Sequence, residues 1–162
     1  MKTIKDIEVG IIEDFEMFDD WVQKYEYLID LGKELVPIEE KYKIEDNLIR
    51  GCQSRVWLHT EKQDEKIIYT ADSDAIMTKG IIAILIRVLS NQTAAEIISA
   101  DLSFIDAIGL KEQLSATRAN GLVSMIKKMK LYLLLIEFHQ QIVSLKSAKK
   151  CLLILAQSLL KS

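Results

Sequence analysis

The segment NLIRGCQSRVWLH, residues 47–59, carries the residue best suited to chemistry, a cysteine directly after a glycine. The chain has only two cysteines, so a network of structural disulfides is excluded and Cys52 either reacts or packs. Arg50 and Arg55 flank it, and positive neighbours favour the thiolate, which is the nucleophilic form. A loop between strands also displays a side chain on a rigid scaffold. We therefore interpret Cys52 as a reactive thiol, against the alternative of a small buried apolar residue.

Several kinds of thiol site lack the residues that they need. A cysteine–histidine hydrolase requires an imidazole near the thiol, and His59, seven residues beyond Cys52 on an extended strand, would lie on the order of 20 Å away. Spacing does not exclude His139, but a lone histidine near a helix end is typical of a surface residue. A zinc site would need both histidines and both cysteines without the usual short spacings, so no metal site is predicted. GxGxxG, GxxxxGK[ST] and HExxH motifs do not occur either.

Sulfur exchange is the chemistry that remains for this thiol. Attack on a sulfur atom needs only a thiolate, a good leaving group and access, and no resident base. A disulfide oxidoreductase would bring a second cysteine in a CxxC motif, which the sequence lacks. The partner sulfur would therefore come from another protein, and a stand-alone enzyme is not expected.

Charge is distributed unevenly along the 162 residues. Residues 1–46 carry 14 acids and 6 lysines, whereas residues 143–162 carry 4 lysines and no acid. The acidic third argues against nucleic-acid binding and is either a solvated surface or one that steers a basic partner. The longest uncharged apolar segments are too short to span a bilayer, and the N-terminus lacks the features of a secretory signal. A single cytoplasmic domain is predicted, without membrane or nucleic-acid partners.

Two amphipathic helices and a small sheet are predicted around the thiol. Isoleucines recur at helical spacing over residues 3–15, and a second helix follows, with Asp19 or Asp20 as its N-cap and Gly32 as a left-handed C-terminal cap. VWLHT and KIIYTA, separated by EKQDE, predict an antiparallel hairpin. NLIR, before the cysteine, predicts a third short strand, and Gly51 allows the sharp turn that follows it.

Helices dominate the rest of the chain. Asp72, Ser73 and Asp74 are good N-caps for the apolar segment that follows, within which Gly80 indicates close packing. Two short helices come next, and then a long helix with one apolar stripe over about residues 117–140. The fold class is therefore α+β, with a small antiparallel sheet of about three strands packed against several helices.

Four motifs resemble, in order and spacing, those of the SufE family of sulfur-acceptor proteins: GCQSRVWL at 51–58, ADSDA at 71–75, KG with an apolar helix at 79–86, and SATRANGL at 115–122. The segment 19–35 is similar to that family's N-terminal pattern of Trp, Tyr and LGK. The resemblance runs from about residue 3 to residue 140. Residues 1–142 are therefore predicted to form one SufE-like domain, with a fold similar to that of IscU-type scaffold proteins.

The resemblance implies a specific function. SufE-like proteins accept the sulfane sulfur of a persulfide on a cysteine desulfurase (SufS-like), stimulate that enzyme, and pass the sulfur to a downstream scaffold for iron-sulfur cluster assembly. The acceptor in the family's GCxSxVW motif corresponds to Cys52. The protein would carry a transient cysteine persulfide and bind no cofactor, because pyridoxal phosphate belongs to the partner. The alternative is a non-catalytic regulatory protein that binds the desulfurase and changes its shape.

Other residues near the motifs have expected supporting roles. Gly51 would let the loop bend into a partner pocket, and Gln53 and Ser54 would hydrogen-bond the loop backbone. Arg118 is either a surface ion pair or a charge that steadies a thiolate or persulfide. Asp72 and Asp74 are first of all helix caps and secondarily partner contacts. The complete set is the thiol loop with its support, Gly51, Cys52, Gln53, Ser54, Arg55 and Arg118, and the partner-binding residues Arg50, Asp72 and Asp74.

The C-terminal segment, residues 143–162, lies beyond the resemblance and is both basic and apolar. It would extend the last helix, mediate self-association through its Leu and Ile face, or remain poorly ordered. Cys151 matches no motif of the family, so it is interpreted as a buried or incidental thiol. A monomer or a weak homodimer is expected.

Overall fold

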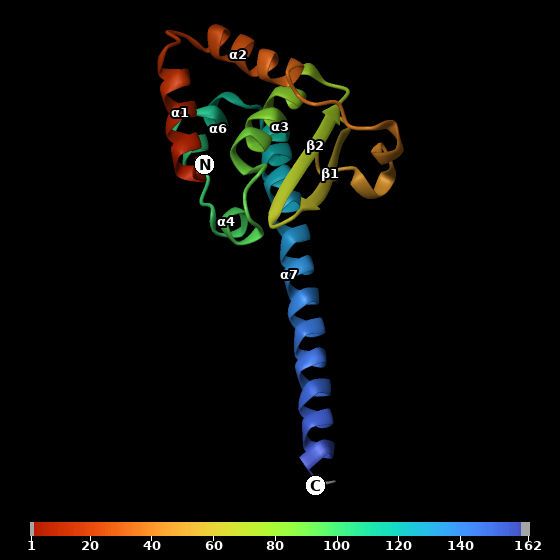
Figure 1. The fold of residues 1–162 in the computed structure, drawn as a ribbon. Coiled ribbons are helices and arrows are strands. Elements are labelled where there is room, and N and C mark those ends of the chain that lie inside the picture. Colours follow the sequence, from red (N-terminus) through yellow and green to blue (C-terminus); the bar gives the residue numbers. More distant parts are fainter. Residues whose placement is uncertain (1, 160–162) are drawn as a thin grey trace.

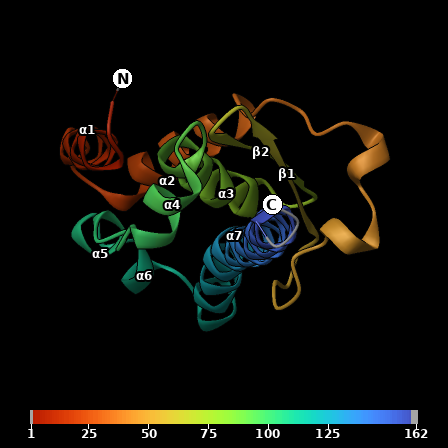
Figure 2. The ribbon, with the colours of Figure 1, turned by 60° about the horizontal axis from the view of Figure 1, so that its bottom comes forward.

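The amphipathic segments fold into helices around a short sheet, and the last helix extends far beyond them as a rod (Figure 1). The computed structural model describes residues 2–159, and side chains are described for residues 2–150. Viewed close to the axis of this last helix, α7 (Ala116–Leu159), most of the other elements lie to one side of it (Figure 2). The combination of helices with an antiparallel strand pair confirms the α+β class.

The first two helices form where the periodicity predicts them. Thr3 and Asp6 make a reciprocal capping box at the start of α1 (Ile4–Glu16). The side chain of Asp20 caps α2 (Trp21–Lys33) by accepting a hydrogen bond from a backbone N–H. Of the two predicted caps for this helix, Asp20 is therefore the one used.

The prediction that Gly32 ends α2 as a left-handed cap is wrong. The helix continues through Gly32, because this residue lies where α2 crosses α3 (Ile76–Leu89). A Cβ atom on Gly32 would lie 2.9 Å from the backbone nitrogen of Gly80, and one on Gly80 would overlap the carbonyl oxygen of Leu28. Both glycines thus allow two helix backbones to touch, which confirms the expected close packing at Gly80.

The hairpin is formed as predicted by β1 (Val56–Gln63) and β2 (Lys66–Ser73), which pair antiparallel along their full length. The predicted third strand is wrong: within the described residues the sheet has two strands, and Leu48 makes only an isolated bridge to Trp57. Two short 3-10 turns, η1 (Glu40–Tyr42) and η2 (Glu45–Asn47), occupy the chain before this bridge. Too little extended chain therefore remains before the turn at residue 51 to form a strand.

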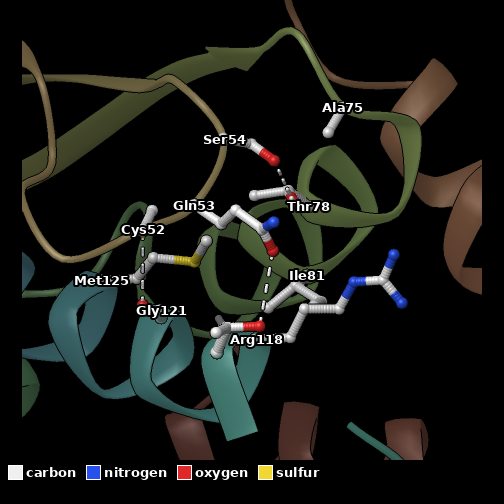
Figure 3. Close-up of a pocket in the computed structure, with 10 residues that line it drawn as sticks. Cys52, Gln53, Ser54, Ala75, Thr78, Ile81, Arg118, Gly121 and Met125 are labelled. Carbon is white, nitrogen blue, oxygen red and sulfur yellow. Dashed lines mark hydrogen bonds between the residues drawn. The ribbon is translucent and has the colours of Figure 1, made fainter. Parts of the chain in front are cut away.

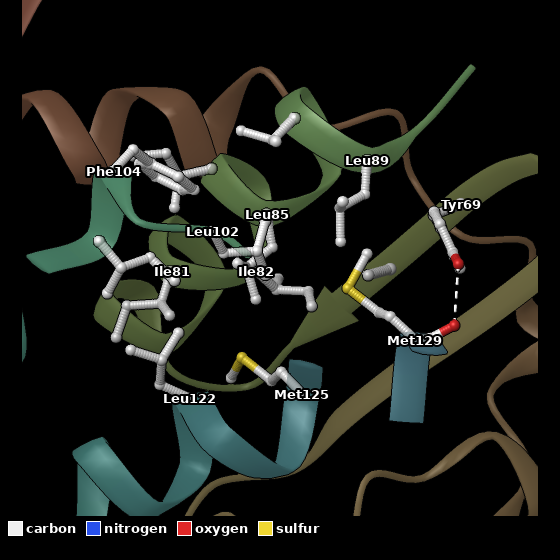
Figure 4. Packing of buried hydrophobic residues seen from close by; sticks show 14 of the residues in the cluster. Tyr69, Ile81, Ile82, Leu85, Leu89, Leu102, Phe104, Leu122, Met125 and Met129 are labelled. Atoms are coloured by element: carbon white, nitrogen blue, oxygen red, sulfur yellow. Dashed lines mark hydrogen bonds between the residues drawn. The ribbon is translucent and has the colours of Figure 1, made fainter. Parts of the chain in front are cut away.

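The core is built around α3, which is buried on most of its surface. Leu122, Met125 and Met129 on the first half of α7 pack against it (Figure 4). The hydroxyl of Tyr69 on β2 donates a hydrogen bond of 2.9 Å to the carbonyl oxygen of Met129. Sheet, central helix and last helix therefore meet in one apolar interior, which fixes the first half of α7 relative to the hairpin.

Three short helices, α4 (Ala94–Ser99), α5 (Phe104–Ala107) and α6 (Leu110–Gln113), connect α3 to α7. The long helix does not end near residue 140: α7 is 44 residues long and continues to Leu159. Of the alternatives for the C-terminal segment, extension of the last helix is therefore the one observed as far as Leu159. No helix within residues 2–159 combines the length and apolar character that a membrane span requires.

Candidate functional site

The thiol loop, residues 50–55, joins the Leu48 bridge to β1 and turns at Gly51. Gly51 has a φ angle of +92°, a conformation that residues with a side chain rarely adopt. A Cβ atom at this position would also lie 2.6 Å from the hydroxyl oxygen of Ser124 on α7. Backbone geometry and the neighbouring helix therefore both require glycine before the cysteine.

The side chain of Cys52 points toward the beginning of α7 (Figure 3). Its Sγ donates a hydrogen bond of 3.7 Å to the carbonyl oxygen of Gly121. A Cβ atom on Gly121 would lie 3.4 Å from the same sulfur, so the helix leaves little spare room there. The thiol is half-buried, and this burial raises its pKa because the charged thiolate loses solvation. At rest the sulfur is therefore a sheltered, protonated thiol.

Cys52 opens into a cavity of about 290 Å³ between the thiol loop, α3 and α7 (Figure 3). The lining residues come from these three elements and the end of the hairpin: Cys52, Gln53, Ser54, Ala75, Thr78, Ile81, Thr117, Arg118, Gly121 and Met125. This lining, all of it from described residues, contains no histidine, lysine or carboxylate. The cavity can therefore admit a small sulfur-bearing group but offers no general base.

Gln53 and Ser54 were predicted to hydrogen-bond the loop backbone, but the hydrogen bonds that the structure gives their side chains are to two helices. Thr117 of α7 donates a hydrogen bond of 3.4 Å to the side-chain oxygen of Gln53. Thr78 of α3 donates one of 3.5 Å to the hydroxyl oxygen of Ser54. Both contacts join the loop to a helix rather than to its own backbone, and Figure 3 marks them with dashed lines.

The prediction that Asp72 and Asp74 cap the following helix is wrong. The N-cap of α3 is Ala75, and no side chain caps this helix. Asp74 instead accepts a hydrogen bond of 3.0 Å from the backbone N–H of Arg55, so its carboxylate is already used by the thiol loop. The carbonyl oxygen of Arg55 accepts a hydrogen bond from Ser73. The end of the hairpin thus fastens the C-terminal side of the loop.

Asp72 lies within β2 between two lysines. Its carboxylate oxygens are 3.0 Å from Nζ of Lys43 and 2.9 Å from Nζ of Lys79. Burial alone would raise the pKa of Asp72, but the hydrogen bonds from these lysines outweigh it and leave the pKa below its usual value. This carboxylate therefore ties the segment before η2 to the first turns of α3.

The arginines of the predicted site lie apart from the sulfur. Arg50 is exposed and pairs with Glu45 at 2.8 Å. Arg55 contributes its backbone to the contacts described above, and its side chain is exposed. Arg118 lines the cavity, but its guanidinium extends away from Cys52 (Figure 3). The structure therefore brings one of the three arginines to the cavity and places none of the three guanidinium groups on the thiol.

Neither histidine contributes to the cavity. The ring of His59 stacks on Tyr42 with centroids 3.6 Å apart, and His139 is exposed on α7. Within the described residues, no three His, Cys, Asp or Glu side chains are grouped so as to hold a metal ion. Cys151 was interpreted as a buried or incidental thiol, and this stays a prediction because its side chain lies outside those that the structure describes.

Six cavity residues were not singled out as site residues from the sequence: Ala75, Thr78, Ile81, Thr117, Gly121 and Met125. Gly121 and Thr117 belong to SATRANGL, so that motif carried a signal for them. Met125 belongs to the apolar stripe of the last helix, which does not distinguish a cavity wall from a core residue. No sequence signal marks Thr78.

A family model decides the relationship of the chain to known proteins. The model described as "SufE: Fe-S metabolism associated domain" matches residues 10–133. The chain belongs to the SufE family. Its SufE-family match includes the thiol loop and the part of α7 that packs against it, and it ends at Leu133.

Relatives in bacteria and plants support this membership. An uncharacterized SufE-like protein of Rhizobium meliloti is 40% identical over 125 residues, covering 74% of this chain and 89% of the relative. An uncharacterized SufE-like protein of Synechocystis is 40% identical over 119 residues, covering 74% of this chain and 75% of the relative. The chloroplastic/mitochondrial SufE-like protein 1 of Arabidopsis thaliana is 37% identical, covering 74% of this chain and 32% of the plant protein.

A solved structure supports the fold independently. The solution structure of a hypothetical protein from Thermus thermophilus matches with a TM-score of 0.66 at 16% identity, and the match covers 78% of this chain and 93% of that one. At this identity the match shows the fold alone. Family membership associates the chain with iron-sulfur metabolism.

Proposed function

We propose that this SufE-family protein accepts a sulfane sulfur from a cysteine desulfurase onto Cys52 and passes it on for iron-sulfur cluster assembly. The observation that carries the proposal is a single thiol in an open cavity whose lining provides no base. Such a site is poorly suited to hydrolysis but sufficient for sulfur exchange, in which the donor supplies an activated sulfur. The reaction takes place in the cytoplasm, where thiols stay reduced.

The transfer step conserves atoms and electrons. The thiolate of Cys52 attacks the terminal sulfur of the donor's persulfide and forms a new S–S bond, while the donor's S–S bond breaks and its cysteine leaves as a thiolate. The proton lost by the Cys52 thiol goes to solvent or to the donor. No net oxidation occurs, because one persulfide replaces another.

The cavity gives a small group access to Cys52, but full exposure of the half-buried sulfur would require the thiol loop to move away from α7. Two long hydrogen bonds hold the thiol loop against α7: 3.7 Å between Cys52 and Gly121, and 3.4 Å between Thr117 and Gln53. Bonds of this length are weak. A docked donor that replaces them would expose the sulfur and remove the burial that raises its pKa. Binding would thus couple exposure of Cys52 to its activation.

The donor provides the chemistry that this chain lacks. We propose that pyridoxal phosphate acts only in the desulfurase, that this protein binds no cofactor of its own, and that its persulfide is transient. Arg50, Arg118, Asp72 and Asp74 are proposed as residues near the docking face, because all four lie around the thiol loop or the end of the hairpin. A downstream scaffold would then take the sulfur from Cys52.

The half-buried thiol also favours a second candidate, a regulator that stimulates the desulfurase by binding alone. A sheltered, protonated sulfur is less reactive than an exposed one, so a docking role that never uses it fits the resting geometry. The two functions differ in what the sulfur atom of Cys52 does.

Persulfide mapping distinguishes sulfur relay from regulation by binding alone. The protein is mixed with a desulfurase and cysteine, and the modified cysteine is located. Trypsin cleaves after Arg50 and Arg55, so Cys52 lies in the peptide GCQSR, whereas Cys151 lies in a different peptide. Sulfur relay predicts a mass gain of about 32 Da, one sulfur atom, on GCQSR. It also predicts that Cys52→Ser abolishes stimulation of sulfide release, while Cys151→Ser does not.

Two outcomes would contradict relay. Stimulation that survives Cys52→Ser would support the regulator, and labelling of the Cys151 peptide in place of GCQSR would refute the assignment of the acceptor. Thermal unfolding of Cys52→Ser confirms that the variant is folded before it is assayed, since serine is nearly isosteric with cysteine.

A further inference from the structure

Two routes lead to the sulfur of Cys52, and they differ in the size of the donor that can use them. A donor protein needs the thiol loop to move away from α7, because the sulfur is half-buried against that helix. The cavity between the thiol loop, α3 and α7 already reaches Cys52 in the resting fold (Figure 3). A small donor can therefore use a route that is closed to a protein.

We propose that Cys52 also accepts sulfur from a small organic persulfide that bears a carboxylate and binds in this cavity without a desulfurase. This inference rests on the proposed function, since it takes the same sulfur as the acceptor, and it adds a second class of donor. The sulfur of Cys52 bonds to the terminal sulfur of the persulfide, and the donor's own S–S bond breaks with its electron pair on the leaving sulfur. The leaving thiolate takes up the proton that Cys52 loses, so the step needs neither a base nor an oxidant.

The volume of the cavity limits the size of such a donor. The cavity holds about 290 Å³. If each non-hydrogen atom takes the space of a water molecule in the liquid, about 30 Å³, the cavity has room for about ten of them. Cysteine persulfide has about eight and fits, whereas glutathione persulfide has about 21 and does not. The resting route should therefore select donors by size.

The charge of the lining favours an anionic donor. Arg118 is the only charged residue that lines the cavity, and it forms no ion pair within the described part of the chain. Its guanidinium lies on the side away from Cys52 (Figure 3). A donor whose persulfide meets Cys52 and whose carboxylate follows a few bonds later would extend toward this guanidinium, and guanidinium groups bind carboxylates well.

The nearby acids at the end of the hairpin are already engaged elsewhere. Asp74 accepts the backbone N–H of Arg55, and Asp72 lies between Lys43 and Lys79. Neither carboxylate lines the cavity. The positive charge at its edge is therefore left for a ligand.

The polar side chains of the lining can exchange their present partners for a ligand at little cost. Thr117 and Gln53 are joined at 3.4 Å, and Thr78 and Ser54 at 3.5 Å. Hydrogen bonds of this length are weak, so contacts with the amino and carboxylate groups of a bound donor can replace them. The lining thus offers hydroxyl and amide groups beside one cation.

Rates of sulfur loading with donors of two sizes test the inference. The Cys151→Ser protein is incubated, without a desulfurase, with cysteine persulfide or with glutathione persulfide, and the mass gain of about 32 Da on the peptide GCQSR is followed over time. A peptide of residues 47–59 carries the same thiol without the cavity and serves as the reference. The rate with cysteine persulfide divided by the rate with glutathione persulfide should be about tenfold or more higher in the protein than in the peptide. This ratio cancels the lower reactivity of a sheltered thiol.

Substitution of Arg118 tests the role of charge. Arg118→Met keeps most of the side-chain length but removes the cation, so the rate with cysteine persulfide should fall about threefold or more. Cysteamine persulfide lacks the carboxylate, and its rate should not change. Lys127→Met is the matched control, because Lys127 is also an exposed cation on α7 but does not line the cavity. Its rates with both donors should equal those of the parent protein.

Three results would overturn the inference: no loading by cysteine persulfide, equal size ratios in protein and peptide, or equal effects of Arg118→Met on the two small donors. Loading by a desulfurase is measured on the same Cys151→Ser protein. If the desulfurase labels GCQSR and cysteine persulfide does not, the second donor class is refuted and the proposed relay stands. If neither labels it, both are refuted.

Discussion

The sulfur of Cys52 lies 3.7 Å from the carbonyl oxygen of Gly121, a residue 69 positions later in the chain. This contact joins the thiol loop to the first turns of α7. A side chain at position 121 would point at the sulfur, because a Cβ atom there would be 3.4 Å from it. The size of residue 121 therefore controls how well the thiol is sheltered.

Substitutions at Gly121 should change thiol reactivity in a graded way. Alanine places its Cβ in ordinary van der Waals contact with the sulfur of Cys52, so the rate of alkylation should stay within about twofold. Valine adds two methyl groups against the sulfur and should displace the loop, raising the rate several-fold. Iodoacetamide alkylation in a Cys151→Ser background measures both. A Gly121→Val rate equal to the wild-type rate would mean that the loop is not held by this contact.

The thiol should titrate at a higher pH in the folded protein than in the unfolded chain. Burial raises the pKa of Cys52, so the thiolate fraction at neutral pH is below that of an ordinary cysteine. The alkylation rate of the Cys151→Ser protein should therefore level off at a higher pH than that of a peptide of residues 47–59. The unfolded chain loses this proton first as pH rises, so folding stability should fall through the same range. Coincident profiles would contradict a sheltered sulfur.

Replacement of Gly51 by alanine should destabilise the protein by about 1–3 kcal/mol, because the new residue would have a positive φ angle and would contact Ser124. Ser124→Ala removes the hydroxyl that lies 2.6 Å from the added Cβ atom. The double variant should therefore recover part of the loss while the backbone strain remains. Urea denaturation of the two single variants and the double variant measures this coupling. Simple additivity would show that the Ser124 contact is unimportant.

Gly80→Ala should reduce the free energy of unfolding by about 1–3 kcal/mol or more, since its methyl group would overlap the backbone of α2 at Leu28. Gly10→Ala is the matched control, because no atom lies within 4 Å of a Cβ at that helical position. The control should be neutral or stabilise by up to about 1 kcal/mol. Thermal unfolding distinguishes the two. Similar effects at both positions would contradict a direct contact between α2 and α3.

Glu8 is buried in α1, and its Oε1 lacks a hydrogen-bond partner within the described residues. Burial raises the pKa of this carboxyl, so its ionisation makes folding less favourable as pH rises through that pKa. Glu8→Gln should therefore stabilise the protein by about 1 kcal/mol at neutral pH, and the gain should disappear in acid, where Glu8 is protonated. Exposed Glu13 provides the control, since Glu13→Gln should have little effect at either pH. Denaturation at the two pH values gives the comparison.

Patterns that depend on neighbouring residues were readable from the sequence. The hairpin follows from two β-branched segments around a polar turn. Helix α1 follows from apolar spacing, and α2 follows from apolar spacing and an N-cap at Asp20. The glycine before Cys52 indicated a sharp turn, and a positive φ angle is observed. These features are local, because hydrogen bonds and side-chain periodicity within a few residues decide them.

Contacts between distant segments were decided only by the tertiary structure. Glycine is the residue type that most often ends a helix, yet Gly32 lies inside α2, where the backbone of Gly80 packs against it. Aspartate is also a common helix N-cap, yet the carboxylate of Asp74 accepts a hydrogen bond from the backbone N–H of Arg55, 19 residues away. The shelter of Cys52 by Gly121 is of the same kind. A sequence lists the groups that a residue offers, but which partner it meets depends on how the packed elements bring remote backbones together.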